Sequence, residues 1–185
     1  MKKIFVFGMA SFLLWACNSG NTNEVSNTAT ETQTGGGQSA VKDDESAKDV
    51  VKVAAGSPDH TTLVAAVKQA GLVDALSNAG PFTVFAPVNK SFESLPAGTV
   101  DDLMKPENKE KLADILQYHV YVGSLKTDLM QDGQTLNQVN GGNITISKSA
   151  DGKVKVNNSA NIIASIPASN GIIHVIDGVL LPPAK

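Results

Sequence analysis

The sequence predicts an α+β domain in which helices of the first half pack on a mainly antiparallel β-sheet, arranged as a wedge or sandwich. After Ser57-Pro58, apolar residues recur at helical spacing, at Leu63, Ala66, Val67 and Ala70. Beyond residue 134, short alternating runs are separated by turn signals, Asn140-Gly141-Gly142, Ala150-Asp151-Gly152 and Asn170-Gly171. Helices followed by hairpins are typical of α+β folds.

The helices can be placed from their start and stop residues. Ser57-Pro58 predicts a helix start, with Ser57 as the cap and Pro58 in the first turn, where its missing N–H is not needed. Gly71 predicts the end of that helix, and a short second helix follows as far as Gly80. Pro106 predicts the start of another helix, whose apolar face carries Leu112, Ile115 and Leu116.

The strands are predicted from composition and alternation. Residues 82–86 form an apolar run before Pro87, and residues 118–122, YHVYV, read as a second strand. The later short runs cover residues 134–139, 144–147, 154–156, 162–166, 172–176 and 179–181. Their spacing predicts hairpins and therefore mainly antiparallel pairing.

The N-terminus predicts a segment that is removed before the protein matures. Lys2 and Lys3 precede an apolar run, residues 4–15, which is too short to span a bilayer as a mature helix. The run ends at LWAC, and this arrangement resembles a bacterial lipoprotein signal covering residues 1–16, with Cys17 as the lipidated residue. Asn18, rather than Asp, after the cysteine favours the outer membrane in a host that has one. The alternative is an ordinary secretory signal followed by a chance cysteine.

Residues 17–46 are expected to form a flexible linker. They are rich in Asn, Thr, Ser, Gly and Gln and contain no aromatic residue, so they cannot bury enough apolar surface to offset chain entropy. A flexible chain of that length spans roughly 30 Å. The expected organisation is therefore a lipid-anchored tether, one domain over residues 47–182, and a short tail, residues 183–185, held at the cell envelope.

Composition excludes several classes of function. All 15 basic residues are Lys, and removal of Lys2 and Lys3 leaves 13 of them against 18 acidic residues, a net charge of −5. An acidic chain without Arg is a poor nucleic-acid binder. Cys17 is the only cysteine, so its lipidation would leave no thiol for a disulfide, a nucleophile or a metal site.

Three ordered motifs point to one family. They are FTVFAPVNKSF from Phe82 to Phe92, the Tyr118-His119 pair within LQYHV, and NGIIHVIDGVLLP from Asn170 to Pro182. In order and spacing they resemble the signature blocks of the fasciclin domain, over roughly residues 51–182. The resemblance implies a fasciclin-like fold and adhesion at a cell surface or matrix, through contact with a protein or a glycan.

Asn89 and Ser91 raise the question of catalysis in the first motif. Asn89 is expected to cap a short helix over residues 90–95, accepting from backbone N–H groups of its first turn, so that Phe85 and Phe92 fold back into one core. A reactive Ser91 would need a base and an oxyanion hole, and the chain has no G-x-S-x-G elbow. We therefore expect no enzyme, no cofactor and no metal.

The three histidines lack metal-ligand spacing. His119 and His174 lie in apolar runs and are expected to be neutral, partly buried and bonded to backbone, as structural residues. In the alternative interpretation, which the family resemblance implies, Tyr118 and His119 belong to a recognition surface. His60, in the first turn of a helix, is expected at the surface.

Two functions therefore remain open. The first is a tethered interaction module whose partners are the membrane, through its lipid, and an unknown surface protein or glycan. The second is a carrier of a small apolar ligand, because some fasciclin-like proteins bind pigments.

Overall fold

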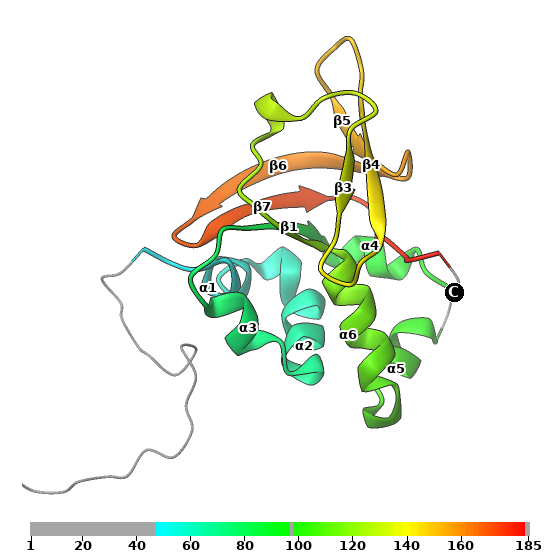
Figure 1. Ribbon diagram of the computed structural model, residues 1–185. Helices are drawn as coiled ribbons and strands as arrows, with labels where there is room; N and C mark the ends of the chain where they lie inside the picture. Colours follow the sequence, from blue (N-terminus) through cyan, green and yellow to red (C-terminus); the bar gives the residue numbers. More distant parts are fainter. Residues whose placement is uncertain (1–46, 97, 184–185) are drawn as a thin grey trace, which may run out of the picture. The chain divides into compact units, whose positions relative to one another are not determined.

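The computed structural model describes residues 47–96 and 98–183 (Figure 1). The predicted signal peptide, Cys17 and the linker up to residue 46 lie outside the described residues, as do the last two residues of the predicted tail. The described helices are α1 (Val50–Ala55), α2 (Thr61–Ala70), α3 (Val73–Ser77), α4 (Asn89–Glu93), α5 (Thr99–Leu103) and α6 (Lys109–Tyr118), with short 3₁₀ turns η2 (Pro58–His60), η3 (Pro106–Asn108) and η4 (Thr127–Leu129). None of these helices is long and apolar enough to cross a membrane.

Helix α2 confirms the predicted helical spacing. Its buried positions are Leu63, Ala66, Val67 and Ala70, and it ends at Gly71, which has a left-handed backbone with φ 75°. A left-handed residue at this position is most often glycine, because glycine has no Cβ to strain. Pro58 starts the preceding 3₁₀ turn as expected, but the side chain of Ser57 makes no hydrogen bond to the backbone there.

Seven strands form one sheet in the order β2-β1-β7-β6-β5-β4-β3. The strands are β1 (Phe82–Pro87), β2 (Val120–Val122), β3 (Thr135–Asn137), β4 (Asn143–Lys148), β5 (Val154–Val156), β6 (Ala160–Ala168) and β7 (Gly171–Ile176). Among these seven strands of the described residues, β1 and β7 pair in parallel and every other pair is antiparallel. The predicted α+β class with a mainly antiparallel sheet is confirmed.

The sheet almost closes on itself. Its edge strands approach through a single bridge between Tyr121 and Gln138, and the backbone N–H of Val139 donates to the carbonyl of Val120 at 2.9 Å. Helices α1, α2, α3 and α6 gather beneath β1 and β7, whereas β3, β4 and β5 rise on the other side (Figure 1). The curled sheet therefore has an inner face of its own and an outer face covered by helices.

Alternation along β1 separates two cores. Ala86, with Val84 at its margin, faces the helices, whereas Phe85 faces into the curled sheet. The helical core consists of Val50, Leu63, Ala66, Val67, Ala70, Leu76, Ala86, Leu112, Leu116, Val120, Ile173 and Val175. The sheet core consists of Phe85, Tyr118, Met130, Leu136, Ile144, Ile146, Val154, Val156, Ala160, Ile176 and Leu180. Phe92 packs against the helical core, so the expectation that it shares a core with Phe85 is wrong.

Two predicted strands are shorter than expected or absent. Residues 118–122 are split, because Tyr118 ends α6, His119 follows it as the C-cap, and only Val120–Val122 is a strand. Residues 179–181 form no strand, because the backbone N–H of Leu180 donates to the imidazole of His119 at 3.0 Å instead of to a neighbouring strand. Composition identified both segments as apolar but could not reveal that a side chain takes the place of a strand partner.

Candidate functional site

The junction between α6 and β2, formed by Tyr118 and His119, is the candidate site. Each residue is 2 % exposed. Tyr118 belongs to the sheet core, whereas His119 borders the helical core. The junction therefore connects the two cores.

His119 is held by two backbone groups on opposite sides of its ring. Nε2 accepts the N–H of Leu180 at 3.0 Å, and Nδ1 lies 2.8 Å from the carbonyl of Ile115. Because the N–H of Leu180 can only donate, Nε2 must carry a lone pair and Nδ1 must carry the proton that it donates to Ile115. The neutral imidazole is thus satisfied at both nitrogens, which confirms the expectation of a buried, backbone-bonded histidine.

Burial keeps His119 neutral. Desolvation lowers the pKa of His119 from 6.5 to about 4, and the hydrogen bond to the carbonyl of Ile115 opposes this only in part. Protonation at Nε2 would also remove the acceptor that holds Leu180. The side chain is therefore fitted to positioning the segment after β7 and is poorly placed to contact a partner directly.

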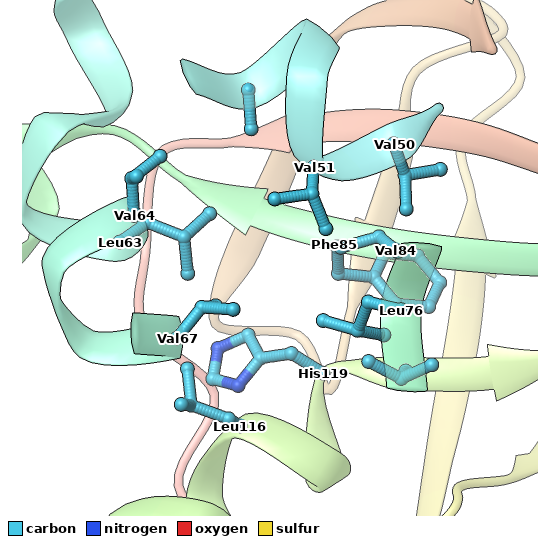
Figure 2. A pocket seen from close by; sticks show the side chains of 12 residues that line it. Val50, Val51, Leu63, Val64, Val67, Leu76, Val84, Phe85, Leu116 and His119 are labelled. Atoms are coloured by element: carbon cyan, nitrogen blue, oxygen red, sulfur yellow. The ribbon is translucent and has the colours of Figure 1, made fainter. Parts of the chain in front are cut away.

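Two small apolar cavities meet at His119. Each has a volume of about 30 Å³, and Leu63, Leu116 and His119 contribute to the walls of both. Figure 2 shows the imidazole among aliphatic side chains of α1, α2 and β1. A volume of this size holds about one water molecule or methyl group. Neither cavity approaches the roughly 300–1,000 Å³ of an ordinary ligand pocket.

Tyr118 connects α6 to the turn between β3 and β4. Its hydroxyl donates to the carbonyl of Asn143 at 2.7 Å and lies 3.1 Å from Nδ2 of Asn157, which donates to it. Gly142 packs so closely on the ring that a Cβ there would stand 2.8 Å from it. We refer to residues 137–143 as the polar turn. Tyr118 therefore supports the polar turn from within.

His174 and Thr83 form a second cluster of polar side chains inside the molecule. The sequence predicted a buried, backbone-bonded role for His174 but not for Thr83. Nε2 of His174 donates to the carbonyl of Leu125 at 2.7 Å, and Nδ1 lies 2.8 Å from the hydroxyl of Ser165. Thr83 donates to the carbonyl of Gly123 at 2.6 Å and accepts the N–H of Leu125 at 3.0 Å. Both side chains are fully buried, and burial lowers the pKa of His174. They hold the chain after β2, and a polar Thr within an apolar strand was the only sequence signal for this role.

His60 is buried, so its predicted surface position is wrong. Only 4 % of the residue is exposed, and Nδ1 lies 2.8 Å from the hydroxyl of Ser57. Burial lowers its pKa, opposed by the charge of Asp59. The 3₁₀ turn before α2 rotates the ring inward, which helical spacing alone could not reveal.

Asn89 caps a different helix from the one expected. It is the first residue of α4 and makes no cap bond there. Its Oδ1 instead accepts the N–H of Thr62 in the first turn of α2 at 3.0 Å, while Nδ2 donates to the carbonyl of Pro58 at 2.9 Å and to the hydroxyl of Thr61 at 3.0 Å. The predicted chemistry is right and the predicted target is wrong, because the nearest unpaired N–H groups in space belong to α2.

Ser91 and Asn170 are also structural in this geometry. Ser91 is buried, with its hydroxyl 3.4 Å from the carbonyl of Ile176. Asn170, read from the sequence as a turn residue, accepts the N–H of Val50 at 2.9 Å and donates to the carbonyls of Leu76 and Asn78, each at 2.8 Å. Among the described residues, no group of three or more His, Cys, Asp or Glu side chains could hold a metal ion.

Comparison with known proteins gives consistent matches. A family model of the fasciclin domain matches residues 58–182. Protein sll1483 of Synechocystis is 54% identical over 139 residues, covering 75% of this chain and 76% of that protein. Cell surface glycolipoprotein MPB83 of Mycobacterium bovis is 35% identical over 141 residues, covering 74% of this chain and 61% of that protein.

A solved structure supports the same fold. The FAS1 domain pair from the insect cell adhesion molecule Fasciclin I superposes with a TM-score of 0.64 at 20% sequence identity. The match covers 72% of this chain and 51% of the domain pair. At this identity the likeness concerns the fold.

Proposed function

The chain belongs to the fasciclin domain family, and from that premise we propose that it is a membrane-tethered extracytoplasmic module that binds a cell-surface or matrix partner. The observation that carries the proposal is family membership together with the names of its relatives. One relative is a cell surface glycolipoprotein, and the matching solved structure comes from a cell adhesion molecule.

The tether in this proposal is the lipid on Cys17 followed by the linker. A single acyl chain gives only marginal membrane binding, so stable anchoring requires more than one chain or a second membrane-binding signal. Asn18 favours delivery to the outer membrane. The domain would then act within reach of the linker, at the cell envelope.

The binding surface in this proposal is the polar turn. Tyr118 and His119 are buried, so they would position the surface and leave the contact to residues outside them. Asn137 and Asn143 are exposed, and Nδ2 of Asn137 donates to Oδ1 of Asn143 and to the carbonyl of Gly141. Oδ1 of Asn137 and Nδ2 of Asn143 then offer an acceptor and a donor to a protein or a glycan. Val139, 46 % exposed, adds an apolar contact on the same turn.

A carrier of a small apolar ligand is the second candidate function. The apolar walls of the two cavities beside His119 favour it chemically. Their volumes of about 30 Å³ mean that the helical core would have to open before a pigment or lipid could enter. Protein purified from its native host would be coloured or would carry extractable lipid if this function holds.

Cell fractionation tests the tether. Cells producing the full chain are expected to hold it in the membrane fraction, whereas Cys17→Ser is expected to be recovered in the soluble extracytoplasmic fraction. Metabolic labelling with a fatty acid should mark only the unaltered chain. Equal solubility of the two proteins would overturn the lipoprotein proposal.

Retention of cells tests the binding surface. Cells displaying the full chain are compared on a support coated with envelope fragments from the same host. Val139→Ser should reduce retention, and the matched control Ile163→Ser, which alters another exposed apolar side chain on β6, should not. Both changes lie at the surface and should alter stability by less than about 0.5 kcal/mol. Equal effects of the two variants would exclude the polar turn as the binding surface.

A further inference from the structure

The chain contains two Asn-Gly pairs, Asn140-Gly141 and Asn170-Gly171, in different environments. Glycine after asparagine leaves the following backbone nitrogen unhindered, because glycine has no Cβ. That nitrogen can then approach the side-chain amide of the asparagine. The two pairs therefore form an internal comparison for the same chemistry.

Asn170-Gly171 is locked against this approach. The side chain of Asn170 is held by Val50, Leu76 and Asn78, all far from its own backbone in sequence. Gly171 lies in β7, beside the backbone of Phe82 with no room even for a Cβ. Neither the amide nor the following nitrogen can turn toward the other without opening the fold.

Asn140-Gly141 has the opposite arrangement. Oδ1 of Asn140 accepts the N–H of Gly142 at 3.0 Å, which folds the side chain over the intervening Gly141. The same N–H would stabilise negative charge developing on Oδ1 when Cγ is attacked. Gly141 has φ 81°, and a Cβ built there would meet nothing within 4 Å, so the peptide has space to rotate.

We propose that Asn140 is a site of spontaneous modification, in which the backbone nitrogen of Gly141 attacks Cγ of Asn140. A bond forms between that nitrogen and Cγ, the bond from Cγ to Nδ2 breaks, and the proton lost from the nitrogen leaves with Nδ2 as ammonia. Water then opens the resulting succinimide ring at one of its two carbonyl carbons. The product is aspartate or isoaspartate at position 140.

Hydrogen bonds from Nδ2 of Asn140 to Asp114 and from the N–H of Gly141 both oppose the reaction. The N–H of Gly141 donates to the carbonyl of Gln138 at 2.9 Å, and this bond must open before the nitrogen can attack. Gly141 is exposed, so water can replace the carbonyl as a partner. Opening one exposed turn is a smaller disturbance than breaking the three hydrogen bonds that tie Asn170 to two other segments of the chain.

The product would change the polar turn. Nδ2 of Asn140 lies 3.3 Å from both the carbonyl and the carboxylate Oδ1 of Asp114 on α6. A carboxylate at position 140 would lose both contacts and would face Asp114 with the same charge. Isoaspartate would also insert an extra backbone atom beside Gly142, which packs on the ring of Tyr118.

Mass spectrometry of the full chain tests the proposal. The protein is incubated in mildly alkaline buffer, digested at acid pH, and mapped for peptides in which an amide has become an acid. Conversion at Asn140 is expected, with Asn170 slower by on the order of a hundredfold, because the reacting groups are held apart there. Protein isoaspartyl methyltransferase should methylate the incubated chain, and Asn140→Gln should abolish most of this signal.

The same incubation in concentrated urea is the matched control. Unfolding removes both environments, so the two Asn-Gly pairs should then react at similar rates. Equal rates in the folded chain would overturn the proposal, as would conversion of Asn140 slowed as strongly by folding as that of Asn170. Gly141→Ala should slow conversion at Asn140 without changing the rate at Asn170.

Discussion

The helical core and the sheet core are built from similar aliphatic residues but are packed differently. The helical core borders two cavities of about 30 Å³, whereas Ile144, Ile146, Val156 and Ile176 in the sheet core are fully buried and line neither cavity. Strand register places neighbours at repeated spacings, so alternate side chains meet regularly. Helices that meet a sheet depend on individual side chains to fill the space between the layers, and small gaps remain where they do not.

Both cores satisfy their buried polar side chains through backbone groups. In the sheet core, Tyr118 bonds to the polar turn and His174 bonds to the chain after β2. Beside the helical core, His119 bonds to one carbonyl and one N–H from segments that no strand pairing connects. In both regions a single side chain connects segments that no strand pairing joins, so the two cores differ in packing and not in how their polar side chains are satisfied.

The largest expected effect is in the sheet core. Ile146→Ala removes a fully buried side chain from a closely packed site and should lower the free energy of unfolding by about 4 kcal/mol. Urea unfolding measures the change, with the exposed Thr145→Ala on the same strand as the control, expected to differ from wild type by less than about 0.5 kcal/mol. A small loss for Ile146→Ala would mean that the sheet core can collapse around a gap.

His119→Ala should lower the free energy of unfolding by about 3 kcal/mol, nearly as much as Ile146→Ala. It leaves a cavity beside two existing ones and removes the partners of Ile115 and Leu180. Urea unfolding at neutral pH gives the value. An unfolding midpoint equal to that of wild type, combined with lost cell or matrix binding, would move Tyr118 and His119 to the functional surface.

Acid should weaken the wild-type protein through the same residue. The pKa of His119 is about 4 in the folded chain and 6.5 in the unfolded chain, where the ring is in water. As the pH falls, the unfolded chain therefore binds the proton first. The contribution of neutral His119 to the free energy of unfolding is fully present above pH 6.5. It is lost progressively as the pH falls to about 4, by about 3 kcal/mol in total. Burial of His60 and His174 acts in the same direction.

The control for the acid prediction is the His119→Ala variant. Its free energy of unfolding should fall less over the same pH range, because one of the three buried histidines is gone. Parallel pH curves for the two proteins would show that His119 does not cause the acid sensitivity.

Substitution of Asn89 should cause an intermediate loss of stability. Asn89→Ala removes the cap of α2 and the two bonds donated by Nδ2, for a loss of about 1–2 kcal/mol. Asn89→Asp keeps the acceptor for Thr62 but loses both donated bonds, so it should also destabilise. Chemical denaturation tests this expectation. If Asn89 served only as a helix cap, Asn89→Asp would have nearly the same stability as wild type.

The smallest expected effect is an increase in stability from a substitution in the helical core. Val67→Ile adds one methylene next to a cavity in whose wall Val67 lies and should stabilise the protein by about 0.5–0.8 kcal/mol. Thermal unfolding would detect it. The same kind of enlargement in the sheet core, Val156→Ile, should destabilise because Val156 is fully buried and lines neither of the two cavities.

Local patterns were sufficient for much of the fold. The spacing on α2, its end at Gly71 and the hairpin turns near Asn140 and Asn170 were read correctly, because each depends on residues close in sequence. Residues 118–122 were misread as one strand, since Tyr and Val favour strands wherever they occur. The helix extends to Tyr118 because there its ring reaches the sheet core and its hydroxyl reaches Asn143.

By itself, the sequence determined the α+β class, the helical spacing of α2, and the motifs that identify the family. Only the tertiary structure decided which polar groups meet. Asn89 bonds Thr62 across 27 positions, His119 bonds Leu180 across 61, and Asn170 bonds Val50 across 120. The reason is physical: apolar periodicity is a property of one segment, whereas a buried donor or acceptor is satisfied by whichever group folding brings within about 3 Å of it.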